Sequence, residues 1–273
     1  MSEFITKSNI KLFYEDLGNK DTNKVVAFFN GVMASTNSWY LLTPIFEKMG
    51  YRIILHDFKG QLKSDKPEGP YTFKEHCDEA KELFDYLGVK EVNIIGTSYG
   101  GEMAMKSAIL YPELTKTISV IDSVSEVDDI CAGLVLGWKV FADTKDGEVF
   151  FNAMAPSIYG PEFIKNNKEM LATRAKAIKN NPNNYLEGQK TLYDTFVKEC
   201  HFTDELHNIK CPALIIVGDQ DFLKPIKFSQ ILADKIPNSE FIILPNCGHV
   251  SIFEKPNELQ SMIFGFVEKH QLF

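Results

Sequence analysis

The stretch "IIGTSYGG" (Ile94–Gly101) places a serine among glycines directly after an apolar, strand-like run. Gly96 and Gly100 stand two residues before and two residues after Ser98, which matches the pattern G-x-S-x-G. In this pattern the serine stands on a sharp turn between a strand and a helix, which approach closely because the neighbours are small. The helix-like run "GGEMAMKSA" follows. We therefore predict that Ser98 is a nucleophile; the alternative is a glycine-rich turn in which it only caps the helix.

Apolar runs recur along the chain and alternate with amphipathic, helix-like stretches. Runs without hydrophobic alternation are typical of parallel strands covered on both faces. Stretches such as "KEHCDEAKELFDYLG" carry apolar residues on one helical face and end at a glycine. This alternation predicts an α/β fold with a doubly wound, mostly parallel sheet. The apolar runs that we interpret as strands are residues 24–31, 51–60, 91–98, 117–123, 211–219 and 240–246.

Residues 124–206 break this rhythm, because they show several helical patterns and no convincing strand. They stand between two predicted strands, so we expect an inserted helical cap over the carboxyl edge of the sheet. Residues 1–123 and 207–273 would then form the α/β core. Most aromatic side chains of the cap would form its own core, and a few would line an apolar pocket. The candidates for this pocket are Asn30, Met33, Trp39, Trp138 and Phe141.

A serine hydroxyl is a weak nucleophile and needs a base beside it. His249 follows the last predicted strand in "PNCGHV", and function in such folds gathers at the carboxyl ends of parallel strands. A carboxylate should orient the imidazole, and "IIVGDQDFLKP" offers Asp219 and Asp221, with Asp122 as a third candidate. We favour Asp221, because it lies deeper in its loop than Asp219.

Acyl transfer also requires hydrogen-bond donors for the oxygen that becomes negatively charged. The predicted donors of this oxyanion hole are two backbone N–H groups, that of Tyr99 directly after the serine and that of Val32 in the loop after "KVVAFFNG". Gly31 would allow this loop to approach the substrate closely. Asn30 would hold the loop by side-chain hydrogen bonds or serve only as a turn residue.

Five pieces of the chain resemble the α/β-hydrolase superfamily: "FFNGVMAS", "LHDFKGQLKSDKP", "IIGTSYGG", "IIVGDQDFLKP" and "PNCGHV". The second piece stands where relatives usually carry D-x-R-G-x-G-x-S, from which Lys59 and Leu62 depart. The order Ser98, Asp221, His249 is that of the superfamily. The resemblance implies the α/β-hydrolase fold, a Ser-Asp-His triad and no cofactor. Partial likenesses are to 3-oxoadipate enol-lactonases and to the acyltransferase that joins hydroxyalkanoyl chains in rhamnolipid synthesis.

The composition narrows the class of partner. The net charge of −8 argues against nucleic acid or an anionic membrane as a partner. We see no run that resembles a signal peptide and none that reaches the ~20 apolar residues of a membrane span. The five scattered cysteines show no C-x-x-C, which argues against a zinc site and for reduced thiols. We expect a cytoplasmic protein without a metal.

Together these features predict a serine hydrolase that cleaves a small, largely apolar carboxylic ester or lactone through an acyl-enzyme on Ser98. Its partner would be this small-molecule substrate. Two alternatives stay open, because fold alone does not determine function. One is an acyltransferase that uses the same triad, and the other is a ligand-binding member of the superfamily without turnover. The motifs do not separate hydrolysis from acyl transfer, since both pass through the same acyl-enzyme.

Overall fold

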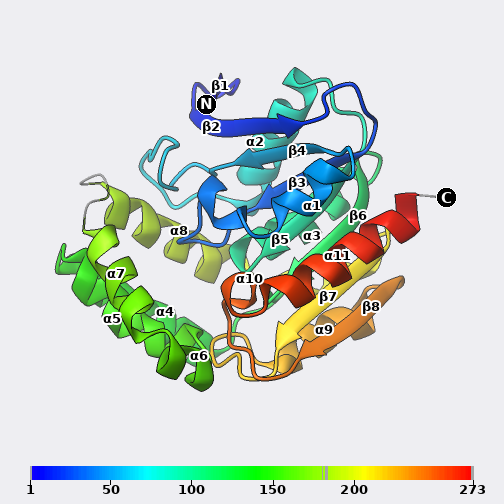
Figure 1. The fold of residues 1–273 in the computed structure, drawn as a ribbon. Helices are drawn as coiled ribbons and strands as arrows, with labels where there is room; N and C mark the ends of the chain where they lie inside the picture. Colours follow the sequence, from blue (N-terminus) through cyan, green and yellow to red (C-terminus); the bar gives the residue numbers. More distant parts are fainter. Residues whose placement is uncertain (1, 180, 182–183, 272–273) are drawn as a thin grey trace.

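The computed structural model describes residues 2–179, 181 and 184–271, which contain an eight-stranded, mostly parallel sheet with helices on both faces (Figure 1). The strand order is β1-β2-β4-β3-β5-β6-β7-β8. Strand β2 (Lys11–Gly18) pairs antiparallel with β1 (Ser2–Ile5) and with its other neighbour β4, and the remaining pairs are parallel. The other strands are β3 (Val25–Phe29), β4 (Arg52–His56), β5 (Val92–Thr97), β6 (Thr115–Ile121), β7 (Ala213–Gly218) and β8 (Ser239–Leu244). The predicted α/β-hydrolase fold is confirmed.

The central strands are buried on both faces, which explains their continuous apolar sequences. In β3, Val26 and Phe28 belong to one hydrophobic cluster, whereas Ala27 and Phe29 belong to another on the opposite face. This alternation follows from the two-residue period of a strand. One face packs against α1 (Thr43–Lys48), α10 (Ser251–Glu254) and α11 (Pro256–Gln271), and the other against α2 (Phe73–Tyr86), α3 (Tyr99–Leu110) and α9 (Ile226–Lys235).

Among the described residues, five α-helices follow one another between β6 and β7, and we call them the helical layer (Figure 1). Aspartates begin two of them, because Asp128 and Asp146 accept hydrogen bonds from backbone N–H groups of the first turn. Within the described part of the predicted cap, 124–206, the extended structure is limited to one bridge between Glu126 and His201. Residues 180, 182 and 183 of the predicted cap lie outside the described residues. The layer consists of α4 (Asp129–Asp143), α5 (Gly147–Ile158), α6 (Pro161–Asn166), α7 (Lys168–Ile178) and α8 (Tyr185–Glu199).

Two short 3-10 helices, η1 (Thr36–Trp39) and η2 (Thr203–Asn208), complete the described elements. All five cysteines are free thiols. A bilayer-spanning helix needs about 20 apolar residues, and no helix in the described ranges is long and apolar enough to meet that requirement.

Candidate active site

Ser98 stands at a sharp turn between β5 and α3, with a positive φ of 51°. Such a backbone conformation costs a residue with a side chain about 1–3 kcal/mol, so the surroundings must stabilise it. Two glycines allow the close backbone approach that this turn requires. A Cβ at Gly96 would lie 2.1 Å from the carbonyl oxygen of Gly100, and a Cβ at Gly100 would lie 2.0 Å from that of Phe29. The structure therefore contains the tight strand-to-helix turn that the sequence predicts.

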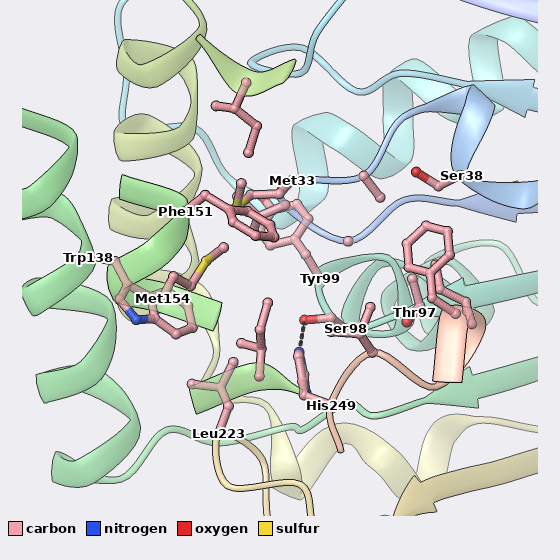
Figure 2. Close-up of a pocket in the computed structure, with 18 of the residues that line it drawn as sticks. Met33, Ser38, Thr97, Ser98, Tyr99, Trp138, Phe151, Met154, Leu223 and His249 are labelled. Atoms are coloured by element: carbon pink, nitrogen blue, oxygen red, sulfur yellow. Dashed lines mark hydrogen bonds between the residues drawn. The ribbon is translucent and has the colours of Figure 1, made fainter. Parts of the chain in front are cut away.

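The hydroxyl of Ser98 lies within hydrogen-bond distance of the imidazole of His249 (Figure 2). The imidazole in turn lies within hydrogen-bond distance of the carboxylate of Asp221. The distance from Oγ to Nε2 is 3.0 Å, and that from Nδ1 to Oδ2 is 2.8 Å. His249 is 7% exposed and Asp221 is 5% exposed. The two residues come from the loops after β8 and β7, so the parallel sheet brings them to the same edge. This geometry allows the hydroxyl to donate to Nε2 while Nδ1–H donates to the carboxylate.

The other two carboxylate candidates have different partners. Asp219 Oδ1 accepts the backbone N–H of Cys247 at 3.2 Å. Asp122 is buried and accepts the backbone N–H groups of Gly218, at 3.0 Å, and Ser251, at 3.3 Å. Burial raises the pKa of Asp122 to about 7, and a neighbouring carboxylate adds to the shift. Both side chains thus hold the strand-end loops together.

The loop after β3 passes close to the serine. A Cβ at Gly31 would lie 3.4 Å from Cβ of Ser98, so the loop lies in van der Waals contact with the serine. Within the described residues, the backbone N–H groups of Val32 and Tyr99 donate to no protein acceptor. Both groups are therefore free to bind an oxygen of a ligand. They are the two donors that the sequence analysis expects for an oxyanion.

A buried hydrogen-bond network supports this loop from behind. Asn30 Nδ2 donates to Asp57 Oδ1 and Gln61 Oε1, both at 3.1 Å, and its Oδ1 accepts from Trp39 Nε1 at 2.7 Å. Gln61 Nε2 donates to the carbonyl oxygen of Gly31 at 2.8 Å. Asn30 and Trp39 have no exposed surface and face the protein interior. The structure thus corrects their assignment to the pocket, and Asn30 holds the loop by side-chain hydrogen bonds.

A cavity of about 280 Å³ opens beside Ser98 and His249 (Figure 2). Of the predicted pocket residues, Met33 and Trp138 line it and Phe141 does not. Phe141 is 39% exposed, because α4 turns a different stripe of residues inward. Among the described residues, no aspartate or glutamate belongs to the lining. The apolar wall that the helical layer contributes includes Val135, Trp138, Phe151, Met154, Tyr193 and Phe196.

Two charged residues beside Ser98 are not among the site residues that the sequence predicts. Lys224 Nζ lies 3.2 Å from Ser98 Oγ and 2.8 Å from Oε1 of Glu102, and the two side chains are only 3% and 0% exposed. Burial alone would lower the pKa of Lys224, but the carboxylate of Glu102 raises it above the ordinary value. Lys224 is therefore an ammonium. The sequence offers one sign of this pair: Lys224 in "DFLKP" and Glu102 in "GGEMA" each stand close to the end of a predicted strand.

The loop that carries His249 is attached to the helical layer. The backbone N–H of His249 donates to the carbonyl oxygen of Ile158 at 2.7 Å. Glu254 Oε2 accepts the N–H groups of Gly160, at 3.1 Å, and Gly248, at 3.0 Å. A Cβ at Gly248 would lie 2.4 Å from the nitrogen of Gly160, so glycine is required for this close approach.

Known proteins are similar in sequence to this chain over most of their length. It is 25% identical to a poly(3-hydroxyalkanoate) depolymerase of Ectopseudomonas oleovorans, over 89% of this chain and 84% of that protein. It is 22% identical to a proline iminopeptidase of Lactobacillus helveticus, over 94% of each.

Solved structures agree. An α/β-hydrolase enzyme from a Medee basin deep-sea metagenome library is 29% identical, with a TM-score of 0.91 over 97% of this chain and 96% of that one. The enol-lactonase of Burkholderia xenovorans LB400 has a TM-score of 0.88 at 19% identity, over 98% and 100% of the chains, and shares the fold. The family model described as "alpha/beta hydrolase fold" matches residues 24–256, and the chain therefore belongs to the α/β-hydrolase fold family.

Proposed function

We propose that this protein is a serine hydrolase that cleaves a small, largely apolar carboxylic ester or lactone through an acyl-enzyme on Ser98. One observation carries the proposal: a continuous chain of hydrogen bonds runs from Ser98 through His249 to Asp221 beside an apolar cavity. Pieces of such a unit have little use singly, since the catalytic effects of its members are strongly non-additive.

In the proposed mechanism, His249 accepts the proton of Ser98 Oγ as the oxygen attacks the carbonyl carbon. Asp221 keeps the imidazole in the correct tautomer and stabilises its positive charge. The N–H groups of Val32 and Tyr99 donate to the oxyanion of the tetrahedral intermediate. His249 then gives the proton to the leaving oxygen, and the same residue activates a water molecule that releases the acid from Ser98.

The relatives support ester chemistry and also show how widely substrates vary in this family. A depolymerase of poly(3-hydroxyalkanoate) and a proline iminopeptidase are both similar to this chain. The polarity of the pocket favours the ester or lactone. Its wall is mostly apolar and lacks, within the described residues, any carboxylate that would bind the amino group of a peptide substrate.

The direct test is covalent labelling with a fluorophosphonate probe, followed by mass spectrometry of the modified peptide. The wild-type protein should be labelled at Ser98, and Ser98→Ala should lose both the label and turnover while it stays folded. Ser38 is the matched control, because it is the other serine in the described lining of the cavity. Ser38→Ala should keep the label. Folded wild-type protein without a label at Ser98 would refute the proposal.

A substrate panel then separates hydrolysis from acyl transfer. Short p-nitrophenyl esters, lactones and hydroxyacyl thioesters are incubated with and without alcohol acceptors, and the products are resolved by mass. Release of the free acid in the absence of an acceptor is the expected result. Product that forms only when an acceptor is present would assign the protein as an acyltransferase that uses the same three residues.

A further inference from the structure

The proposed mechanism leaves the buried ammonium of Lys224 without a role. An ammonium carries three N–H donors. Carboxylate Oε1 of Glu102 lies 2.8 Å from Nζ and the hydroxyl of Ser98 lies 3.2 Å away, which accounts for two of them. Nζ also lies 4.6 Å from the centre of the Phe196 ring, and both side chains line the cavity. Lys224 can therefore donate a hydrogen bond to a ligand beside the reacting atoms.

We propose that Lys224 determines substrate specificity by donating a hydrogen bond to a hydroxyl or oxo oxygen on C2 or C3 of the acyl chain. The substrate class then narrows from apolar esters in general to esters or lactones of 2- or 3-hydroxyacyl and oxoacyl groups. This inference rests on the proposed function and adds a substrate to it.

The assignment to the acyl side follows from the groups that surround the reacting carbon. In the tetrahedral intermediate this carbon carries Oγ of Ser98, the oxyanion, the leaving oxygen and the acyl chain. The N–H groups of Val32 and Tyr99 would bind the oxyanion, and His249 would serve the leaving oxygen. The acyl chain is the remaining group, and it would extend past Lys224.

The position of the oxygen follows from distances. Nζ of Lys224 lies 3.2 Å from Ser98 Oγ, which becomes the ester oxygen of the acyl-enzyme. An oxygen on C2 or C3 is three or four bonds from Oγ, which is close enough for it to reach hydrogen-bond distance of Nζ when the acyl chain turns toward Lys224. Farther along the chain the wall is mostly apolar. Its members from α4 and α8 include Val135, Trp138, Tyr193 and Phe196.

The charge balance favours a neutral oxygen over a carboxylate. Glu102 already neutralises Lys224, and both side chains are buried. A substrate carboxylate at this place would add an unpaired buried charge, which is costly. Arg174 is the other cation of the described lining, and it lies on α7. It already has two partners, because it stacks on Phe253 and donates a hydrogen bond to the hydroxyl of Tyr159 at 2.8 Å.

The test compares three ethyl esters of similar size: ethyl butyrate, ethyl 3-hydroxybutyrate and monoethyl malonate, which place a methylene, a hydroxyl and a carboxylate oxygen at C3. The measured quantity is the ratio of kcat/KM for 3-hydroxybutyrate to that for butyrate. The double variant Lys224→Met/Glu102→Gln removes both charges together. It should lower this ratio about 10-fold or more, because a hydrogen bond to a charged group is lost. Intrinsic ester reactivity cancels between wild type and variant.

The matched control is Lys227→Met, which removes an exposed lysine paired with Asp128 at the surface of α9. It should leave the ratio unchanged. An equal fall for both esters in the double variant would mean that Lys224 only positions Ser98, and it would overturn the inference. A wild-type preference for monoethyl malonate over 3-hydroxybutyrate would overturn the neutral-oxygen class.

A binding measurement keeps this inference separate from the proposed function. N-ethyl-3-hydroxybutanamide should bind the wild-type protein more tightly than N-ethylbutanamide in calorimetric titrations, and the double variant should lose the difference. Equal affinity of the two amides for the wild type would contradict the inference, even where Ser98 reacts with the fluorophosphonate. If circular dichroism shows that the double variant does not fold, Lys224→Gln/Glu102→Gln takes its place. Its amide still donates, so part of the preference should remain.

Discussion

The loops at the carboxyl edge of the sheet and the helical layer above them hold their residues in different ways. In the loops, polar side chains have defined hydrogen-bond partners, as in the contacts of Asp221 with His249 and of Gln61 with the carbonyl oxygen of Gly31. In the layer, the rings of Trp138 and Tyr193 pack in a tilted arrangement with 5.7 Å between centroids, and most inward contacts are apolar. Directional contacts fix reacting atoms, whereas apolar packing shapes a volume. Changes in the loops should therefore affect catalysis, and changes in the layer should affect substrate choice.

The sharpest test of the loop side compares two aspartates from the same loop. Asp221→Asn should lower kcat by about 10⁴-fold, because the amide stabilises the wrong imidazole tautomer. Asp219→Asn should cost far less, since this carboxylate accepts only from the backbone of Cys247 within the described residues. Steady-state kinetics on one ester measures kcat for both variants. A larger loss of kcat for Asp219→Asn than for Asp221→Asn would assign the carboxylate of the triad to Asp219.

A smaller loss is expected where the loop is displaced rather than a reacting group removed. Gln61→Ala deletes the donor to the carbonyl oxygen of Gly31 and should lower kcat by about 100-fold through misplacement of the Val32 N–H. Gln260→Ala, which removes a remote bond to the backbone of Leu41, is the control. Similar kinetics for the two variants would show that this network does not position the oxyanion donor.

On the side of the helical layer, the effect should be on substrate choice. Trp138→Leu should lower kcat/KM by about 10-fold for a longer acyl chain and much less for acetate esters, because only the longer chain reaches the wall. Phe141→Leu changes an exposed aromatic residue of the same helix and should leave both values near those of the wild type. An equal loss of kcat/KM for short and long esters in Trp138→Leu would contradict the proposal that the helical layer determines substrate choice.

The prediction with the smallest effect on the catalytic rate concerns His56, at the end of β4, and the measured quantity is the free energy of unfolding. Burial lowers the pKa of His56 from 6.5 to about 3. The unfolded chain binds this proton below pH 6.5 and the folded chain does so only near pH 3. The contribution of His56 to stability should therefore be constant above pH 6.5 and fall by about 1.4 kcal/mol per pH unit between 6.5 and 3.

His56→Leu removes this contribution, so its free energy of unfolding should depend less steeply on pH over that range in urea titrations. The control is His201→Leu, which changes an exposed imidazole next to the helical layer. It should retain the wild-type slope. Identical slopes for wild type and His56→Leu would contradict the prediction.

The contrast between loops and layer also explains what the sequence could predict. Strand ends are recognisable, because apolar runs stop at glycine and polar residues, so the places of Ser98, Asp221 and His249 follow from the pattern. The path of a loop and the rotation of a helix are not encoded by such periodicity. Trp39 therefore faces the core although it follows the Gly31 loop, and Phe141 lies outside the cavity. The partnership of Lys224 and Glu102 escaped prediction, because their segments are 122 residues apart and only the folded sheet joins them.

The bond between His249 N–H and Ile158 has a consequence for how this architecture can be altered. A swing of α5 as a free lid would pull on the backbone of the proposed general base, so opening and catalysis are mechanically linked. The same holds for chimeras. A foreign set of helices in place of α4–α8 would also have to supply the carbonyl oxygen that accepts from the His249 N–H and the N–H that donates to Glu254, as Ile158 and Gly160 do here. The histidine loop and the turn between α5 and α6 therefore form one structural unit. Chimeras whose breakpoints separate these two segments should be folded but inactive.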